Sequence, residues 1–439
     1  MIIQKKIAKK SSFYTRKKAL ENLAATLLKD TTIQEKIIAS YMEATGFTYQ
    51  NLMNREIIEP ATILKNLGEP NDFIDWEIGD MSVRKPLGKV AILLPKNGVG
   101  ITFAKAAAAA YLMGNETIVK FPRQLAKTAV IFKELYSKHL NGLTFAPIHS
   151  SSKAFLQQCM LDSEIKAVVI YGDDKWINDY ALLARRTGTK LIFEGPGNDP
   201  QIVLPDANIE NAVDNAIKGG MNNGGQSCSA LERFFIHDTI YEEFSERLIA
   251  KLATIRYGSP EDKAVELGPL YSEIVLKRIQ QQIKDAVSKG GQLKLGGKII
   301  KSGYQNLHLC TPTVLTECQL EMEVVANETF GPVFPLVRFG NNLDNLLNAL
   351  DQTDYGLNAT LCTSKQWSED SSAVWNYLKS THRNVYLNSN ATSPENRPSR
   401  ILDGGFKRSG FVWERTDRSY IQREGRRYLL EELSAPTGF

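Results

Sequence analysis

A reactive thiol is suggested by the surroundings of Cys228, which lies in a polar stretch beside the adjacent glycines Gly224 and Gly225. Such glycines let the backbone turn sharply and approach a bound molecule, and small neighbours leave the sulfur accessible. Most free cysteines are packing residues, but here the nearest large apolar side chains are Met221 and Leu231. Local composition therefore fits a nucleophile and a packing residue about equally. The remaining cysteines stand in apolar segments and are expected to fill strands and helices: Cys159, Cys310, Cys318 and Cys362.

Two further polar side chains stand where apolar segments end, and both could act on a carbonyl group. Asn97 follows the apolar run at residues 90–94, and Glu194 follows the apolar run at residues 190–193. A fixed amide can donate to an oxyanion, and burial at a strand end would raise the pKa of a carboxyl group toward that of a general base. Taken singly, a turn asparagine and an exposed glutamate are the simpler explanations.

The elements that must position these side chains alternate between short apolar runs and helical patterns. Strands are expected at residues 90–94, 117–121, 143–148, 167–171 and 190–193, and helices at residues 104–113, 125–139, 154–160 and 176–186. Strands that are apolar at nearly every position, each followed by a helix, indicate a parallel sheet covered on both faces. The first half of the chain is therefore predicted to be a doubly wound α/β domain that binds its ligand at the carboxyl ends of the strands.

The cysteine lies in a second alternation of helices and strands, which follows Pro205. Helices are expected at residues 209–217, 240–255, 272–289 and 342–352, and strands at residues 233–236, 331–339, 359–362 and 385–387. This pattern predicts a second α/β domain. Two helices are also expected near the amino terminus, at residues 16–30 and 37–46.

The overall composition is that of an ordinary globular protein. The chain has 439 residues and a net charge of +4, and its basic cluster at residues 5–18 is typical of a solvated end rather than a nucleic-acid arm. Five cysteines without a Cys-x-x-Cys pair fit a reducing compartment, and five scattered histidines suggest no metal. No apolar run approaches the ~20 residues needed to span a bilayer, and no secretory signal is present. We therefore expect a cytoplasmic protein.

Four motifs together resemble those of the aldehyde dehydrogenase superfamily. Residues 223–233 resemble its catalytic-cysteine motif, with Gln226 two residues before Cys228 and Arg233 five residues after it. The sequence Phe-Glu-Gly-Pro-Gly-Asn-Asp-Pro at residues 193–200 is similar to its glutamate motif. Its Glu-x-Phe-Gly-Pro signature is matched at residues 327–333, and its C-terminal signature at residues 404–410. The likeness runs in register from about residue 16 to about residue 434, which is nearly the whole chain.

This resemblance implies oxidation of an aldehyde to a carboxylate, with hydride transfer to NAD or NADP. Cys228 would add to the carbonyl carbon as a thiolate and later carry a thioester. The side-chain amide of Asn97, in the family's Pro-x-Asn motif, would form the oxyanion hole with the backbone N–H of Cys228. Glu194 would activate the water that hydrolyses the thioester.

Cofactor contacts carry over from the same resemblance. Glu328 matches the residue that holds the nicotinamide ribose, with Phe330 packing behind it, and Lys120 matches the lysine that bonds the adenosine ribose. Arg123 stands where NAD-preferring members often have a glutamate, and an arginine there could pair with a 2′-phosphate, which favours NADP. The family binds its cofactor without a Gly-x-Gly-x-x-Gly motif, and this chain has none at the first helix.

The clearest departure from the family pattern lies at Gly172, which is followed by Asp173 and Asp174. The family usually has Gly-Ser-Thr here, at a helix start that receives the pyrophosphate. Two carboxylates would cap that helix themselves and repel a pyrophosphate. We therefore expect the cofactor to be held differently at this point.

The resemblance also implies a domain division and partners. We expect a dinucleotide-binding domain at residues 1–67 and 87–196, a catalytic domain at residues 197–404, a return segment at residues 405–424 and a small β oligomerisation element. That element would comprise residues 68–86 and 425–439 and would make a homodimer or homotetramer. The expected partner is a small-molecule aldehyde, with no nucleic acid.

Two alternatives to aldehyde oxidation remain. The first is an acyl-CoA or acyl-phosphate reductase that uses the same cysteine in the reductive direction. Such enzymes commonly lack the hydrolytic glutamate, so Glu194 favours oxidation. The second is a catalytically silent protein that retains the fold.

Overall fold

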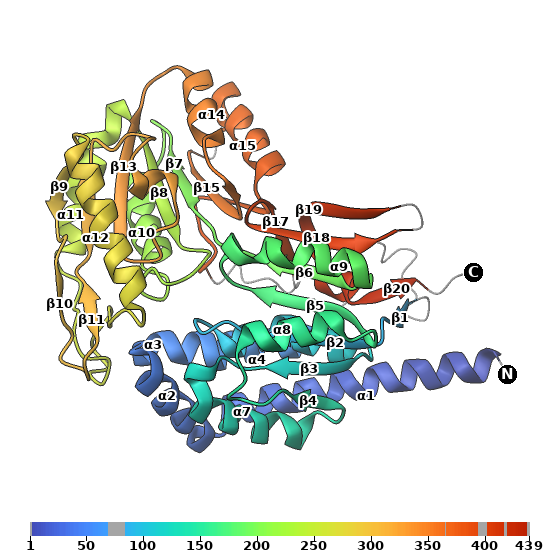
Figure 1. Cartoon of the computed structure of the whole chain (residues 1–439). Coiled ribbons are helices and arrows are strands. Elements are labelled where there is room, and N and C mark those ends of the chain that lie inside the picture. Colours follow the sequence, from blue (N-terminus) through green and yellow to red (C-terminus); the bar gives the residue numbers. More distant parts are fainter. Residues whose placement is uncertain (1, 69–83, 365, 394–401, 417–418, 437–439) are drawn as a thin grey trace.

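Two sheets organise the chain, one of nine strands and one of seven. The computed structural model describes residues 2–68, 84–364, 366–393, 402–416 and 419–436. Figure 1 shows the two sheets in adjoining lobes, with the amino-terminal helices along the larger one. This is the α/β architecture that the alternating pattern predicts.

The nine-stranded sheet has a parallel half built as expected from the first half of the chain. Its strands are β2 (Lys89–Leu93), β3 (Glu116–Lys120), β4 (Leu143–Phe145), β5 (Ile165–Tyr171) and β6 (Lys190–Glu194), in the order β4-β3-β2-β5-β6. Their connecting helical segments are α5 (Val99–Thr102), η4 (Phe103–Ala107), α6 (Ala108–Leu112), η5 (Arg123–Leu125), α7 (Ala126–His139), α8 (Ser152–Leu161), η6 (Asp174–Tyr180) and α9 (Ala181–Thr187). The helix expected at residues 176–186 is therefore a 3-10 turn followed by a shorter α-helix.

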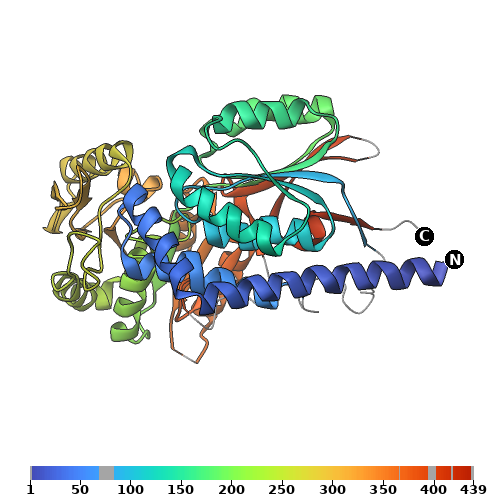
Figure 2. The ribbon, with the colours of Figure 1, turned by 90° about the horizontal axis from the view of Figure 1, so that it is seen from below.

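Helices cover both faces of this sheet because alternate strand residues point to opposite sides. Val90 and Ile92 of β2 pack with the amino-terminal helices and with α6 and α7, whereas Ala91 and Leu93 pack with α8 and α9. The amino-terminal helices are α1 (Ile2–Lys29), α2 (Thr31–Thr45), α3 (Tyr49–Leu52), the π-helical η1 (Met53–Ile58) and α4 (Glu59–Asn66). Seen from below, the long α1 runs beneath the sheet and beyond it (Figure 2).

The other half of this sheet comes from the end of the chain, which the sequence did not indicate. The strand β18 (Gly410–Arg415) pairs antiparallel with β6, so that Gly410 lies opposite Glu194. Further strands extend the sheet in the order β18-β19-β17-β14, with bounds Tyr420–Tyr428 for β19, Leu402–Lys407 for β17 and Tyr355–Gly356 for β14. Residues 405–424, expected only as a return segment, thus complete the first sheet.

The seven-stranded sheet forms the second lobe. Its strands follow the order β16-β15-β7-β8-β13-β12-β9. Their bounds are Asn384–Leu387, Asn358–Cys362, Asp199–Val203, Leu231–His237, Val333–Phe339, Thr313–Thr316 and Gln292–Leu295. The α10 (Ile209–Gly220) and α11 (Tyr241–Leu252) helices cover one face, and α12 (Glu273–Ser288), α14 (Leu343–Asp351) and α15 (Glu369–Thr381) cover the other. The remaining short elements are η7 (Asp238–Ile240), α13 (Glu323–Ala326) and the ribbon of β10 (Ile299–Lys301) and β11 (His308–Cys310).

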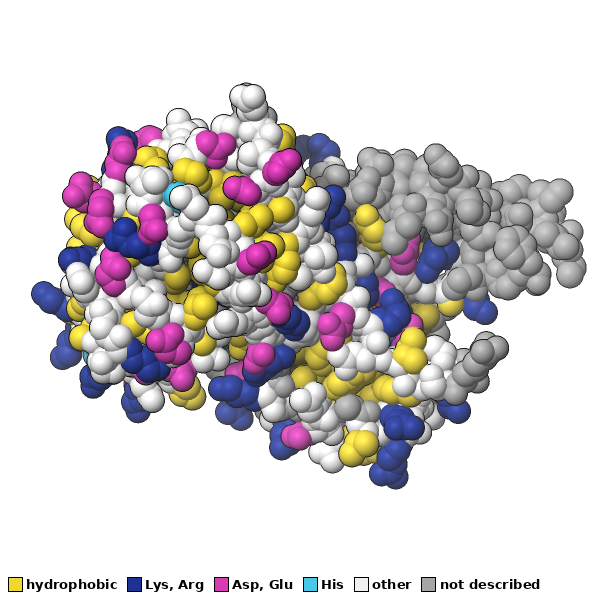
Figure 3. All heavy atoms as spheres, turned by 90° about the horizontal axis from the view of Figure 1, so that it is seen from above, with side chains coloured by type: hydrophobic (Ala, Val, Ile, Leu, Met, Phe, Trp, Pro, Cys, Tyr) yellow, Lys and Arg dark blue, Asp and Glu magenta, His cyan; other side chains and the backbone are white. Residues whose placement is uncertain are grey.

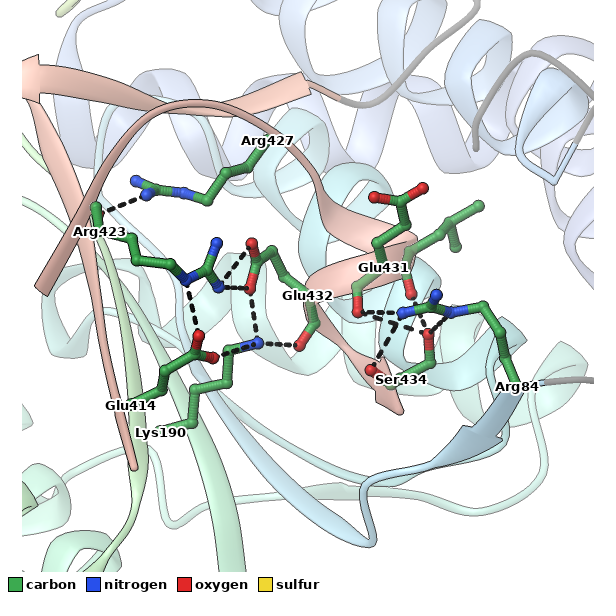
Figure 4. Close-up of polar contacts among 9 residues, drawn as sticks. Arg84, Lys190, Glu414, Arg423, Arg427, Glu431, Glu432 and Ser434 are labelled. Atoms are coloured by element: carbon green, nitrogen blue, oxygen red, sulfur yellow. Dashed lines mark hydrogen bonds and ion pairs between the residues drawn. The ribbon is translucent and has the colours of Figure 1, made fainter. Parts of the chain in front are cut away.

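An ion-pair cluster fastens the C-terminal segment to the first sheet (Figure 4). Lys190 of β6 contacts Glu432 at 2.5 Å and Glu414 of β18 at 3.3 Å, and Arg423 of β19 contacts the same two carboxylates. Glu432 belongs to the short helix α16 (Leu429–Glu432), whose Leu429 is buried in the core. Part of the oligomerisation element expected at residues 425–439 is therefore helical, and its leucines pack in the core.

A two-stranded ribbon follows at the position expected for the oligomerisation element. The strand β1 (Arg84–Pro86) pairs antiparallel with β20 (Ser434–Pro436), and the Arg84 guanidinium donates to the Ser434 hydroxyl at 2.6 Å (Figure 4). Most of the first half of the expected element, residues 69–83, lies outside the described residues. Its role in assembly stays a prediction.

The surface is chemically mixed. Acidic and basic side chains are interspersed on the face seen from above (Figure 3), in keeping with the small net charge of +4. Within the described part of the chain, no helix combines the length and the apolarity that a membrane crossing needs.

Candidate active site

The candidate site lies where the carboxyl ends of the parallel strands in the first sheet meet the amino ends of strands in the second. In the first sheet the parallel strands β3, β2, β5 and β6 end at one edge, where Leu93 lies opposite both Lys120 and Ile170, and Tyr171 lies opposite Glu194. The chain then passes from β6 directly into β7, which places the amino ends of β7 and β8 beside the end of β6. Cys228 precedes β8, and Glu328 precedes its neighbour β13. The topology alone therefore brings the cysteine and both glutamates to one junction.

The Cys228 loop is shaped by left-handed backbone and by close backbone approach. Asn223, Gly224 and Gly225 all have positive φ, of 54°, 66° and 77°. A Cβ on Gly225 would lie 2.3 Å from the carbonyl carbon of Gly331, in the loop that carries Glu328. A Cβ on Gly197 would lie 2.0 Å from the carbonyl oxygen of Cys228 itself. The glutamate motif, the cysteine motif and the Glu-x-Phe-Gly-Pro signature thus touch at their glycines.

The Cys228 thiol is half-buried and sits among charges of both signs. Burial raises its pKa to about 12, and the nearby Glu194 carboxylate adds to the rise. The Arg383 and Arg55 guanidinium groups act in the opposite direction. The other four cysteines are buried, as expected for packing residues. Cys228 is thus the one cysteine that the structure leaves partly accessible and surrounds with candidate catalytic groups.

Asn97 faces the cysteine loop, as its predicted role requires. Its side-chain Nδ2 donates to the backbone carbonyl of Gln226 at 3.2 Å, two residues before Cys228. An amide carries two N–H groups, so a second one is left for an oxyanion. The role itself stays a prediction.

Buried polar groups of the amino-terminal helices hold the Asn97 loop. The Tyr41 hydroxyl donates to the Lys96 carbonyl at 2.6 Å, and Glu56 accepts the backbone N–H of Gly100 at 2.5 Å. Burial raises the pKa of Glu56 to about 8. Nε of Arg55 donates to the carbonyl of Asn97 at 3.3 Å. The helices thus position one member of the site as well as covering the sheet.

Glu194 ends β6 and forms an ion pair that the sequence did not indicate. Its Oε1 contacts Nη1 of Arg383, which lies between α15 and β16, and both side chains are 7% exposed. Nη1 of Arg383 also donates to the carbonyl of Gly404 at 3.2 Å. The proposed base is therefore buried, as expected, but it is also paired with a cation from the second lobe.

The C-terminal signature at residues 404–410 holds the glutamate motif from the other side. Gly195 N–H donates to the Ser409 carbonyl at 2.9 Å, and the Ser409 hydroxyl donates to the Pro196 carbonyl at 2.7 Å. The backbone N–H of Gly356 donates to the same hydroxyl at 3.0 Å. This explains why a motif about 200 residues away in sequence accompanies the glutamate: it contains the turn that leads into β18, the strand paired with β6.

Glu328 lies on a loop that Glu232 fixes. The Glu232 carboxylate, only 2% exposed, accepts the backbone N–H groups of Thr329 and Phe330 at 2.7 Å each. Glu328 itself accepts the backbone N–H of Gly197 at 3.2 Å, and burial raises its pKa to about 7. Phe330 has a positive φ of 61° and packs edge-on against Tyr271. Glu328 is thereby aimed at the junction.

Lys120 and Arg123 lie together at the end of β3. Lys120 is 1% exposed, and its ammonium group donates to the carbonyls of Phe121 and Ile148. Burial and the neighbouring Arg123 charge lower the pKa of Lys120, and the Arg123 side chain is exposed. Three strand positions separate β3 from β6, or about 14 Å at 4.8 Å per strand. Lys120 and Arg123 thus lie at the far end of the same sheet edge from Glu194.

The departure at Gly172 has the structural effect expected from its sequence. Gly172 has a φ of 155°, and the Asp173 carboxylate accepts the backbone N–H of Lys175 at 2.9 Å. The side chain of Asp174 lies outside the described residues. A carboxylate, rather than free N–H groups, therefore occupies the start of this helical segment.

A cavity of about 390 Å³ opens beside Glu328 and provides a test of whether a dinucleotide fits. Its lining includes Glu328, Asp173, Arg278, Gln282 and Arg408. Among the described residues, Nε of Arg278 and Oε1 of Gln282 are buried without a hydrogen-bond partner, which is rare unless a ligand or water completes them. The Gln282 oxygen can accept from a ribose hydroxyl, and the Arg278 and Arg408 guanidinium groups can bind a diphosphate. The lining therefore fits the cofactor, even though Asp173 is also part of it.

Several residues of the site escape sequence reasoning. Arg383, Glu56 and Arg55 stand in segments that read as an ordinary turn and helix, and no motif marks them. Glu232 lies inside the cysteine motif and beside an apolar segment. A glutamate in such a place is rarely buried without a partner, and this could have indicated its structural role.

Comparisons with known proteins show which proteins this chain resembles in sequence and fold. A model of the aldehyde dehydrogenase family matches residues 4–423. The chain is 28% identical over 332 residues to a succinate-semialdehyde dehydrogenase [NADP(+)] 1 of Mycobacterium bovis, covering 74% of this chain and 69% of that protein. It is 28% identical over 376 residues to a succinate-semialdehyde dehydrogenase [NADP(+)] of Mycobacterium avium, covering 84% and 74%. The structure superposes with a TM-score of 0.81 on a succinate-semialdehyde dehydrogenase from Burkholderia pseudomallei, at 24% identity, covering 97% and 84%.

The contact between the Cys228 loop and the Glu328 loop predicts a specific cost for Gly225→Ala. A control is Gly303→Ala, because Gly303 has the same φ of 77° but nothing within 4 Å of its Cβ position. The control should lose about 1–2 kcal/mol of unfolding free energy through backbone strain alone. Gly225→Ala should lose more and should also impair catalysis, because the Gly331 backbone must move. Chemical denaturation and a steady-state assay measure both, and equal losses in the two variants would contradict the role of this contact.

Proposed function

Since the chain belongs to the aldehyde dehydrogenase family and is an NAD(P)-dependent aldehyde dehydrogenase, we propose that Cys228, Asn97 and Glu194 carry out its chemistry. The observation that supports this assignment is the meeting of all three at one junction between two sheets. The partners of Cys228 there are an amide donor and a carboxylate, which are what thioester chemistry on a carbonyl needs.

The first step requires a nucleophile and a place for negative charge. The Cys228 thiol releases its proton to solvent, the thiolate sulfur adds to the aldehyde carbon, and the carbonyl oxygen becomes an oxyanion in a thiohemiacetal. The free N–H of the Asn97 amide and the backbone N–H of Cys228 hold that oxyanion. Because Arg55, Tyr41 and Glu56 fix the loop, the amide is oriented before substrate arrives, which is the source of such stabilisation.

Bound NAD(P)⁺ would accept the hydride from the same carbon, leaving a thioester on Cys228. Glu328, Arg278 and Gln282 would hold its nicotinamide ribose and diphosphate, and Lys120 its adenosine ribose. Arg123 would face the 2′ position. The exposed guanidinium beside Lys120, together with the NADP(+) in the names of two relatives, supports a preference for NADP.

The last step returns the enzyme to its thiol form. Glu194 takes a proton from water, and the resulting hydroxide attacks the thioester carbonyl. The C–S bond then breaks, which releases the carboxylic acid and the Cys228 thiolate, and the thiolate takes up the proton from Glu194. The buried position of Glu194 at the end of β6 limits the number of waters that it can contact. The Asn97 amide and the backbone N–H of Cys228 stabilise the oxyanion of this second tetrahedral intermediate, as they do that of the thiohemiacetal.

The substrate is an aldehyde that carries a second, negatively charged group. Two cations lie near the proposed oxyanion hole, because Arg55 bonds to the Asn97 backbone and Lys96 precedes Asn97. Lys96 lies 4.6 Å from the ring centre of Tyr271, whose backbone N–H in turn donates to Gln226 of the cysteine loop. The names of the relatives, succinate-semialdehyde dehydrogenases, describe such a substrate.

Substitution of the three chemical residues should separate the steps of the reaction. Cys228→Ala should reduce turnover below about 10⁻³ of wild type, and Asn97→Ala should lower kcat by about 10²- to 10³-fold. Glu194→Gln should keep a rapid burst of reduced nicotinamide but slow the following steady state by about 10²- to 10⁴-fold. Stopped-flow absorbance at the reduced-cofactor band measures all three. Normal turnover in Cys228→Ala would refute the assignment.

Cofactor choice should depend on Arg123. Arg123→Glu should lower the ratio of kcat/KM for NADP to that for NAD by about 10- to 100-fold, because it replaces a charge-assisted contact with repulsion. Lys133→Glu, an equal charge reversal at an exposed position on α7, is the control and should leave the ratio unchanged. A ratio that is the same in both variants would show that Arg123 does not contact the cofactor.

Arg55 should bind the negatively charged group of the substrate. Succinate semialdehyde should be preferred to butanal, a neutral aldehyde of equal chain length, and Arg55→Met should lower kcat/KM for the former by about 10- to 100-fold. The value for butanal should change less. Arg247→Met, which removes a surface arginine 46% exposed on α11, is the control. Equal losses for both aldehydes would mean that Arg55 acts only on the Asn97 loop.

A further inference from the structure

Arg383 is the charged residue of the site that the proposed chemistry does not use. It stands between α15 and β16, at the amino end of the second sheet, and its guanidinium reaches Glu194 at the carboxyl end of the first. The pair is buried, with each side chain 7% exposed. Burying an ion pair costs free energy, because both ions lose their hydration. The presence of this pair near Cys228 therefore suggests that it has a function.

Arg383 links the Glu194 side chain to the backbone of β17. One nitrogen, Nη1, contacts the Glu194 carboxylate and donates to the Gly404 carbonyl of β17. The guanidinium is thus fixed to the backbone of the first sheet while it holds the side chain of β6. Burial lowers the pKa of Arg383, but the charge and hydrogen bond of Glu194, together with Tyr386 and Cys228, outweigh this effect and the pKa is raised. Arg383 therefore stays a cation throughout the working pH range.

Several elements around Glu194 supply a charged or titratable group, and Arg383 is the one in direct ion-pair contact among the described residues. The others act through their fields: Lys105 of η4, Tyr171 of β5, Cys228 before β8 and Arg427 of β19. Burial lowers the pKa of Lys105 and raises that of Tyr171. Removal of Arg383 would leave the Glu194 carboxylate beside Cys228 without a contacting cation.

We propose that Arg383 is a positioning residue: its buried ion pair holds Glu194 in place as the base, and loss of that pair moves the pH below which thioester hydrolysis stops. This inference rests on the function proposed above for Glu194. A carboxylate that is ionised accepts a proton from water, and a protonated one does not. Loss of a contacting cation makes a buried carboxyl group easier to protonate by about 1–3 pH units. Hydrolysis should then fail at a higher pH without Arg383 than with it.

The test isolates hydrolysis from hydride transfer by acylating Cys228 with p-nitrophenyl acetate. The thiolate attacks the ester carbonyl and expels p-nitrophenolate, and water then converts the acetyl thioester to acetate and thiol. The burst of p-nitrophenolate reports acylation, and the later steady rate reports hydrolysis, which is followed from pH 5 to pH 9. In Arg383→Met the acidic fall of the steady rate should shift upward by about 1 pH unit or more. In Arg383→Lys, which keeps the charge, it should stay near that of wild type.

Two controls make the outcome specific. Arg426→Met removes an exposed arginine that bonds to Asn384, next to Arg383, and should leave the profile unchanged. Glu194→Gln should abolish the acidic fall. Should Arg383→Met fail to fold, Arg383→Gln is the neutral variant of similar length, with thermal unfolding as the check.

The outcomes distinguish this inference from the function on which it rests. A normal burst with the acidic fall at the same pH in the wild type and the neutral variant would overturn the role of Arg383 alone. An equal shift in Arg383→Lys would do the same, because the charge would then not be the cause. Absence of any burst in the wild type, or a burst that persists in Cys228→Ala, would overturn the proposed function itself.

Discussion

The active site depends on backbone segments that approach one another too closely for any side chain to lie between them. Gly197 lies against the carbonyl of Cys228, and Gly225 lies against the backbone of Gly331. Three loops from two sheets are thereby fixed relative to one another by main chain, which is far stiffer than side-chain contact. The proposed catalytic residues Cys228 and Glu194 and the proposed cofactor-binding residue Glu328 share this precision, because each is within three residues of one of these contacts. Side-chain hydrogen bonds then refine an arrangement that the backbone has already set.

Burial gives the site its electrostatic character. Glu328 has its pKa raised to about 7 and Asp199 likewise to about 7, because the junction of the two lobes excludes water. Charged groups in such a place need partners, and the chain provides Arg278 for the first and the amide of Asn358 for the second. The pairing of Glu194 with Arg383 belongs to the same pattern. Buried carboxylates at this junction are thus partnered by groups that take no part in the proposed bond making.

Most of the architecture could be predicted from sequence, because buried parallel strands are apolar at every position and helices show their own period. The cysteine, asparagine and glutamates could be placed through their motifs, and their meeting at one junction follows from strand order. The residues that could not be found are those whose function depends on a distant partner. Arg383 reads as a turn residue until β16 is placed beside β15, and Glu56 reads as a solvated helix residue until Gly100 covers it.

The C-terminal strands were missed for a related reason. The sequence from residue 402 to residue 428 is rich in glycine and charge, so its pattern gives no strong strand signal. Residues 402–407, 410–415 and 420–428 are strands because β6 offers an open edge to the first of these to pair with it, β18. The late position of these strands in the chain affects folding during synthesis. The sheet begun by β2 is completed only when β18 and β19 leave the ribosome, after the whole second lobe has been made between them. Until then the edge of β6 is unpaired and available to other chains, so the nascent protein carries an aggregation hazard that the last 40 or so residues remove.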